Sequence, residues 1–269
     1  MNIQVAAGAP DREAQQCLRA LGTSDYDLAK HRIPIPIYGT CEWLLTRPQF
    51  IGWRDDPKAS LLLVSGEPGT RKSVLSRALV DGLLVSAGVQ DADICYFFFN
   101  ISSREQSSVA TALSGILHQL FRNNLTLIRY ALDDFRRDGD HFRAKFALMW
   151  DIFLRAVGDS QAGDTILILD ALDECEADGR TQLIRALSEL YSRNARPGLR
   201  LKVLISSRPY PDIEWGLRPK ESGGTYTVRI SGDSEREADA VQREVDLFID
   251  AKIHQLVIDC TSPMKLGFF

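Results

Sequence analysis

Residues 66–73, which read GEPGTRKS, stand between an apolar run at 61–65 and a helical pattern over 72–86. A loop that leaves a buried strand and opens a helix can direct backbone N–H groups and the positive end of the helix dipole at an anion. The segment has the first glycine, the lysine and the serine of the pattern G-x-x-x-x-G-K-[ST]. It therefore predicts a phosphate-binding loop (P-loop).

One position of this loop departs from the pattern, because Arg71 stands where the second glycine belongs. Glycine there permits unusual backbone angles and a close approach of phosphate. An arginine must strain the backbone or swing outward; its guanidinium could add a phosphate contact, but weaker binding is the expectation. Lys72 is predicted to reach the outer phosphates, and the Ser73 hydroxyl to bind magnesium. The predicted nucleotide-binding residues are Gly66, Glu67, Pro68, Gly69, Thr70, Arg71, Lys72 and Ser73.

A second motif is an apolar run at 165–169 that ends in Asp170 and continues as ALDEC. A carboxylate at the tip of a strand in the same sheet as a P-loop can hold magnesium directly or through its water. The predicted metal ligands are therefore Ser73 and Asp170. Either Asp173 or Glu174 is predicted to orient or activate an attacking water.

A third motif follows the apolar run at 201–206, where the chain reads Ser206, Ser207, Arg208 and Pro209. An arginine at the tip of a strand can sense a terminal phosphate, because its charge matches the charge that hydrolysis removes. Arg208 is predicted to have this role. The predicted catalytic residues are thus Asp173, Glu174 and Arg208.

The strand-like runs alternate with helical ones, which predicts an α/β fold with a parallel sheet and crossover helices. Strands are expected at 61–65, 94–99, 165–169, 201–206 and 225–230. Helices are expected at 11–21, 72–86, 107–121, 127–136, 141–157, 179–192 and 238–256. Before the P-loop, the run 33–37 should be extended because of its prolines, and Thr40 should cap a short helix at 42–45.

Composition narrows the classes of function. The formal net charge of −4 and the sequence pI of about 5.6 argue against general binding of nucleic acid, which usually needs a basic face. The sequence has no run of about 18 apolar residues, the length that a membrane helix needs. We therefore expect a cytoplasmic protein without a membrane or nucleic-acid partner.

Taken together, these motifs resemble the NACHT-type signalling NTPases of the STAND class, in particular the fungal receptor-like group with a nephrocystin-like N-terminal NTPase domain. The resemblance extends over about residues 17–256. The segments that carry it are 40–45 (TCEWLL), Phe50 with Trp53, 66–73, 96–100, 170–175 and 206–209.

The resemblance implies a three-layer α/β/α P-loop NTPase with a five-stranded, mostly parallel sheet. The strand that carries Ser206 would lie between the P-loop strand and the Asp170 strand. It also implies ATP or GTP with Mg²⁺, and a switch whose bound nucleotide sets an open or a closed state. Lys72 and Ser73 would hold phosphate and metal, Asp170 would coordinate magnesium, and Arg208 would read the terminal phosphate.

The expected organisation is a helical connector at 1–55, the NTPase core at 56–232 and a trailing helix at 233–269 that begins a truncated helical subdomain. The first hypothesis for function is the core of a nucleotide-dependent signalling switch, with slow hydrolysis at most and with protein partners or self-association. The alternative is a degenerate or truncated NACHT domain that acts as a non-hydrolysing protein-interaction module. A metabolic kinase fits poorly, because no second-substrate site is evident. The choice between ATP and GTP stays open.

Overall fold

The computed structural model describes residues 9–22, 25–37, 39–192, 198–218 and 224–230, together with Ile249 and Ile253. The helix expected at 238–256 lies outside the described residues except for those two positions. The same holds for the trailing segment at 233–269.

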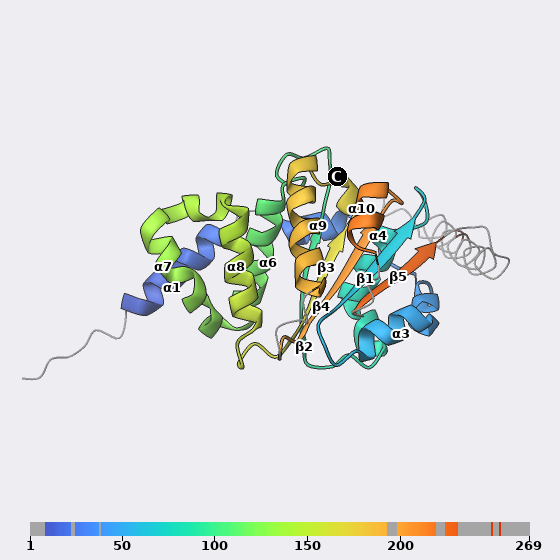
Figure 1. Ribbon diagram of the computed structural model, residues 1–269, viewed down its shortest axis with the longest axis horizontal. Coiled ribbons are helices and arrows are strands. Elements are labelled where there is room, and N and C mark those ends of the chain that lie inside the picture. The colour runs from blue at the N-terminus through green and yellow to red at the C-terminus, as the bar shows by residue number, and fades with distance from the viewer. Residues whose placement is uncertain are drawn as a thin grey trace, which may run out of the picture.

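A five-stranded sheet forms the centre of the molecule, in the order β2-β3-β4-β1-β5 (Figure 1). Its strands are β1 (Ser60–Gly66), β2 (Ala92–Phe98), β3 (Asp164–Asp170), β4 (Leu201–Ser207) and β5 (Thr225–Ile230). Every neighbouring pair is parallel. All residues of β1 are buried, as expected for a strand covered on both faces. The order confirms that the Ser206 strand lies between the P-loop strand and the Asp170 strand.

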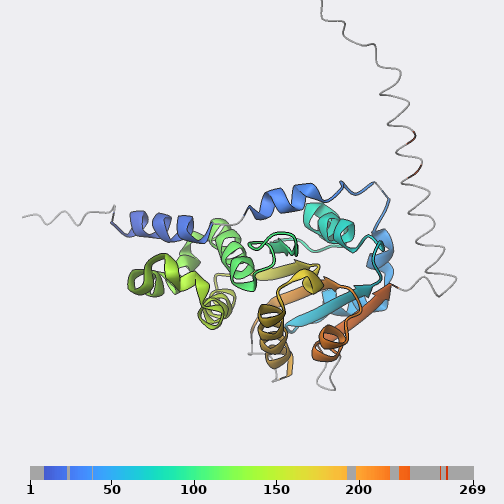
Figure 2. The ribbon, with the colours of Figure 1, turned by 90° about the horizontal axis from the view of Figure 1, so that it is seen from above.

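Helices cover both faces of this sheet. Figure 2 shows α9 and α10 along one face and α4 with α2 along the other, which confirms the three-layer α/β/α fold. Beside the β2 edge, α1 and α6–α8 pack together (Figure 1). The α-helices are α1 (Ala9–Leu21), α2 (Tyr26–Arg32), α3 (Pro48–Asp55), α4 (Lys72–Ala78), α5 (Leu84–Ser86), α6 (Val109–Asn123), α7 (Arg129–Asp138), α8 (Phe146–Val157), α9 (Ala177–Ser192) and α10 (Pro211–Gly216). Among the described residues, no helix has the length and apolar character needed to cross a bilayer.

Two helix predictions are wrong in their continuity. The helix expected at 72–86 is interrupted, because α4 ends at Ala78 and a π-helical turn (Leu79–Leu83) precedes α5. Gly82 makes this turn possible, since its φ of 138° is open to glycine and strained for other residues. The helix expected at 141–157 begins at Phe146, because the extended backbone of Lys145 separates it from a 3₁₀ turn (Gly139–Ala144).

The prediction that Thr40 caps a helix is also wrong. The residue before the 3₁₀ turn Glu42–Thr46 is Cys41, which has a φ of 70° and makes no side-chain capping bond. The Thr40 hydroxyl instead donates to the carbonyl of Ile37 at 2.6 Å. This bond closes the turn that leads out of the extended proline-containing run, so the hydroxyl is not available to the following helix.

The segment just before β1 is fixed by Trp53, whose side chain is fully buried. Its indole Nε1 donates to the carbonyls of Val203 at 3.1 Å and Ser60 at 3.3 Å. These bonds join α3 to both β1 and β4 near the amino ends of the strands. The P-loop strand therefore enters the sheet from a fixed starting point.

Candidate functional site

The carboxyl ends of β1, β3 and β4 meet at one edge of the sheet, because neighbouring strands run parallel. A cavity of about 290 Å³ opens there. Most of the predicted site residues line it, whereas Gly66, Glu67 and Thr70 lie in the loop behind it and Asp170 is buried beneath it. The lining residues are Pro68, Gly69, Arg71, Lys72, Ser73, Val74, Ala171, Asp173, Glu174, Ser206 and Arg208.

The loop keeps the backbone shape that a glycine would allow at position 71. Arg71 has a φ of 59° and a ψ of 26°, the left-handed conformation, and stands directly before α4. For a residue with a Cβ atom this conformation costs about 1–2 kcal/mol. Gly66 has a different reason to be glycine, because a Cβ there would approach the carbonyl oxygen of Ile230 to 3.0 Å. The arginine thus leaves the loop geometry intact and adds strain to it.

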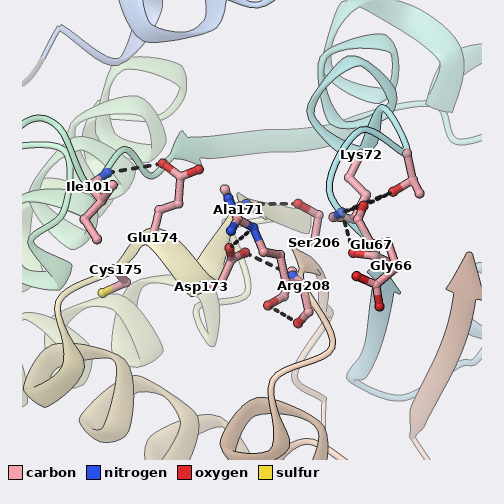
Figure 3. Close-up of polar contacts among 12 residues, drawn as sticks. Gly66, Glu67, Lys72, Ile101, Ala171, Asp173, Glu174, Cys175, Ser206 and Arg208 are labelled. Carbon is pink, nitrogen blue, oxygen red and sulfur yellow. Dashed lines mark hydrogen bonds and ion pairs between the residues drawn. The ribbon is translucent and has the colours of Figure 1, made fainter.

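The ammonium group of Lys72 folds back onto this loop (Figure 3). Its Nζ donates to the carbonyl of Gly66 at 2.6 Å, to the carbonyl of Glu67 at 2.9 Å and to the Thr70 hydroxyl at 3.1 Å. Burial lowers the pKa of Lys72, while the carboxylates of Asp173 and Asp170 act to raise it. The group is therefore a partly desolvated cation that faces two carboxylates.

Asp170 lies at the tip of β3 with a residue exposure of 1%. Its Oδ1 accepts hydrogen bonds from the hydroxyls of Ser206 at 2.5 Å and Ser76 at 2.7 Å. Burial raises the pKa of Asp170, and the hydroxyls of Ser206, Ser73 and Ser76 together with the Lys72 charge act to lower it. The carboxylate is thus held in a fixed orientation beside the proposed metal ligand Ser73.

Ser76 is a site residue that the sequence reasoning missed. It stands three residues after Ser73 on α4, which places both on the same side of the helix. That spacing is a usable signal only when Asp170 is already placed in the neighbouring strand. Ser206 belonged to a recognised motif, but no contact with Asp170 was predicted for it.

Asp173 and Arg208, which were predicted to act on water and on phosphate, bind each other. The Nε of Arg208 lies 3.0 Å from Asp173 Oδ2, and the Arg208 backbone N–H donates to Asp173 Oδ1 at 3.0 Å. The Asp173 side chain is 5% exposed and that of Arg208 is 41% exposed. The carboxylate is therefore occupied by the arginine, whose outer end reaches the cavity.

Glu174 points in another direction. Figure 3 shows its carboxylate directed at Ile101, away from the Asp173–Arg208 pair. Its Oε2 accepts a hydrogen bond from the Ile101 backbone N–H at 3.2 Å. The loop between β2 and α6 thus holds this carboxylate, although Glu174 still lines the cavity.

These features define a class of protein. A buried strand leads through a left-handed loop into α4, a buried acid lies at the tip of β3, and β4 separates the two strands. This is a P-loop NTPase-like domain.

Comparison with known families gives the particular group. The family described as Nephrocystin 3, N-terminal, matches residues 39–208, and the chain belongs to this family. The membership confirms the resemblance to the nephrocystin-like group.

Individual relatives are more distant. Vegetative incompatibility protein HET-E-1 from Podospora anserina is 29% identical over 251 residues, which cover 89% of this chain and 17% of that protein. The chain therefore spans less than a fifth of the length of that relative. Cdc6p from Pyrobaculum aerophilum is 16% identical with a TM-score of 0.43, over 84% of this chain and 53% of that one. The ORC2 protein from Aeropyrum pernix is 17% identical with a TM-score of 0.43, over 85% of this chain and 55% of that one.

The raised pKa of Asp170 predicts the effect of replacing it. Folding favours the protonated carboxyl, so ionisation of Asp170 costs stability as the pH rises through its folded pKa. Asp170→Asn keeps the shape without that cost. At pH 7 in a chelator, we expect its unfolding free energy to exceed that of the wild type by about 1 kcal/mol, or about 2–4 °C in Tm. The difference should shrink as the pH falls toward the ordinary value of about 4.

Thermal melts of both proteins at several pH values measure this difference. A lower Tm for Asp170→Asn at pH 7 in the chelator would mean that the charge of Asp170 supports the fold, which contradicts the burial argument.

Proposed function

We propose that this domain binds a nucleoside triphosphate, ATP or GTP, with Mg²⁺, as the NTPase core of a NACHT-type signalling switch that hydrolyses slowly at most. One observation carries the proposal: a single cavity brings together the loop ahead of α4, the partly buried Lys72 ammonium and the hydroxyl of Ser73, above the buried Asp170. A cytoplasmic location and protein partners or self-association are part of the same proposal. The similarity to a vegetative incompatibility protein supports the signalling role.

The cation at Lys72 supports phosphate binding. Three neutral oxygen atoms of the loop now accept its hydrogen bonds. Phosphate oxygens are charged acceptors, and charge-assisted hydrogen bonds are roughly twice as strong as neutral ones. A phosphate in the cavity would therefore draw the ammonium away from the carbonyls of Gly66 and Glu67. The N–H groups at the start of α4 would hold the same phosphates.

The residues beneath Lys72 fit Mg²⁺. This ion prefers oxygen ligands and is usually bound through one or two carboxylates together with substrate phosphates and water. Asp170 supplies the carboxylate and Ser73 the hydroxyl. The ion would neutralise charge on the phosphates, and Arg208 would add a positive charge at the far side of the cavity.

The positions of the other two acids support slow hydrolysis. Asp173 accepts two bonds from Arg208, and Glu174 accepts one from Ile101. A general base must come within hydrogen-bond distance of the water that it activates. Each carboxylate would have to leave its present partner before it could do so, and that exchange adds to the barrier.

The alternative function, a non-hydrolysing interaction module, is favoured by one observation. Arg71 lines the cavity in a left-handed conformation where the motif has glycine. Its side chain takes up room beside the predicted phosphate position. The two functions differ in whether the natural chain binds nucleotide at all.

Lys72→Ala tests the proposal directly. Because hydrogen bonds to charged groups contribute about 1.5–3 kcal/mol, we expect the affinity for magnesium-bound ATP or GTP to fall about 10- to 100-fold. Titration of fluorescent ATP and GTP in the presence of Mg²⁺ measures it. Lys58→Ala is the matched control, since Lys58 is exposed and precedes β1 at the opposite edge of the sheet. Absence of binding by the wild type to both nucleotides would refute the proposal.

Arg71→Gly separates the two functions. Glycine adopts a φ of 59° without strain and opens the cavity, so the variant should bind nucleotide as tightly as the wild type or up to about tenfold more tightly. The same titration compares the two proteins. If nucleotide binds only to Arg71→Gly, the natural chain is the interaction module.

A further inference from the structure

The connector that precedes the family match touches the P-loop helix. Figure 2 shows α2 beside α4, on the face of the sheet opposite α9 and α10. The Nζ of Lys30 on α2 lies 2.8 Å from Asp81 Oδ1 in the π-helical turn after α4. Arg77 on α4 links the same elements, because its Nε lies 3.0 Å from Asp81 Oδ2 and its Nη1 donates to the carbonyl of Ile33 directly after α2.

Burial makes these contacts important for Arg77. Its side chain is 8% exposed, and a buried guanidinium needs acceptors to offset its lost hydration. Asp81 supplies one, and the Ile33 carbonyl of the connector supplies another. Burial acts to raise the pKa of Asp81, but the hydrogen bonds from Lys30 and Arg77 lower it overall. Displacing α2 would remove acceptor and cation together.

A second set of contacts fixes α2 to the rest of the domain. The Tyr96 hydroxyl on β2 donates to Asp27. The Tyr26 hydroxyl and Nδ1 of His118 on α6 are hydrogen-bonded at 2.9 Å. Lys30 also lies over the Tyr96 ring, 5.4 Å from its centre. The helix α2 is therefore held by β2 and α6 while it contacts α4.

Neighbouring residues of α4 connect these contacts to the candidate nucleotide site. Ser76 donates to Asp170, and the next residue, Arg77, donates to Ile33. The helix is only seven residues long before the π-helical turn interrupts it. Helices this short have little stability of their own, so their position depends on their packing. The placement of Lys72 and Ser73 thus depends on both Asp170 and the connector.

We propose that α2 with Ile33 is a clamp on the P-loop helix, through which the segment before residue 39 regulates nucleotide affinity. The inference rests on the proposed function. A clamped helix is preorganised for phosphate, so release of the clamp weakens binding. Because coupling between two sites is reciprocal, bound nucleotide strengthens the clamp by the same factor.

Two variants release the clamp from opposite sides. Lys30→Met acts from the connector without changing α4, and Asp81→Asn removes the carboxylate that Lys30 and Arg77 share. Glu13→Gln is the matched control, because it breaks a two-bond ion pair between α1 and Arg136 on α7, away from α4. Circular dichroism checks that each variant is folded.

Hydrogen exchange and nucleotide titration give the two readouts. Without nucleotide, amides 74–78 should exchange faster in both clamp variants than in the wild type and in Glu13→Gln. With Mg²⁺, their affinity for ATP or GTP should fall about three- to tenfold. In the wild type, nucleotide should slow exchange in α2.

The outcomes separate the clamp from the proposed function. If the wild type binds nucleotide and both variants bind it equally well, with unchanged exchange, the clamp is overturned and the proposed function stands. If the wild type binds neither nucleotide, the proposed function fails, and regulation of affinity fails with it.

Discussion

The Asp170 carboxylate joins three elements that are far apart in the sequence. It ends β3, and it accepts hydrogen bonds from Ser76 on α4 and Ser206 on β4. Because the group is almost completely buried, its charge is tolerable only with those hydroxyls and the nearby Lys72 cation. The position of the P-loop helix relative to the sheet, and hence the shape of the cavity, depends on this one group.

Around that carboxylate, the cations of the cavity already have partners in the protein. Lys72 binds loop carbonyls, and Arg208 binds Asp173. An anionic ligand would therefore exchange partners with these groups, and its net affinity would be the difference between the new contacts and the old ones. The strain at Arg71 and the clamp on α4 act on the same difference. Such a site suits a switch better than rapid turnover, because several contacts must change together.

The sequence was most informative where burial demands a continuous apolar run. Strands β1 and β3 lie within one residue of their expected bounds at each end, and β5 matches its expected bounds. The motifs also identified the residues that the cavity gathers. The contacts of those residues could not be predicted, because Ser76 and Asp170 are 94 positions apart and Glu174 and Ile101 are 73 apart. Local conformations set by tertiary packing, such as the turn at Gly82 and the left-handed Cys41, were missed for the same reason. The domain limits at 55 and 232 and the roles of the site residues stay predictions.

The most direct test of nucleotide binding at this site is a crystal structure with a non-hydrolysable ATP or GTP analogue and Mn²⁺ in place of Mg²⁺. The account predicts an anomalous Mn²⁺ peak beside Ser73 and Asp170. It also predicts phosphate density at the start of α4, with the Lys72 ammonium moved from the carbonyls of Gly66 and Glu67 onto that phosphate. A crystal grown at saturating analogue with no density in this cavity, or with the analogue bound elsewhere, would contradict it.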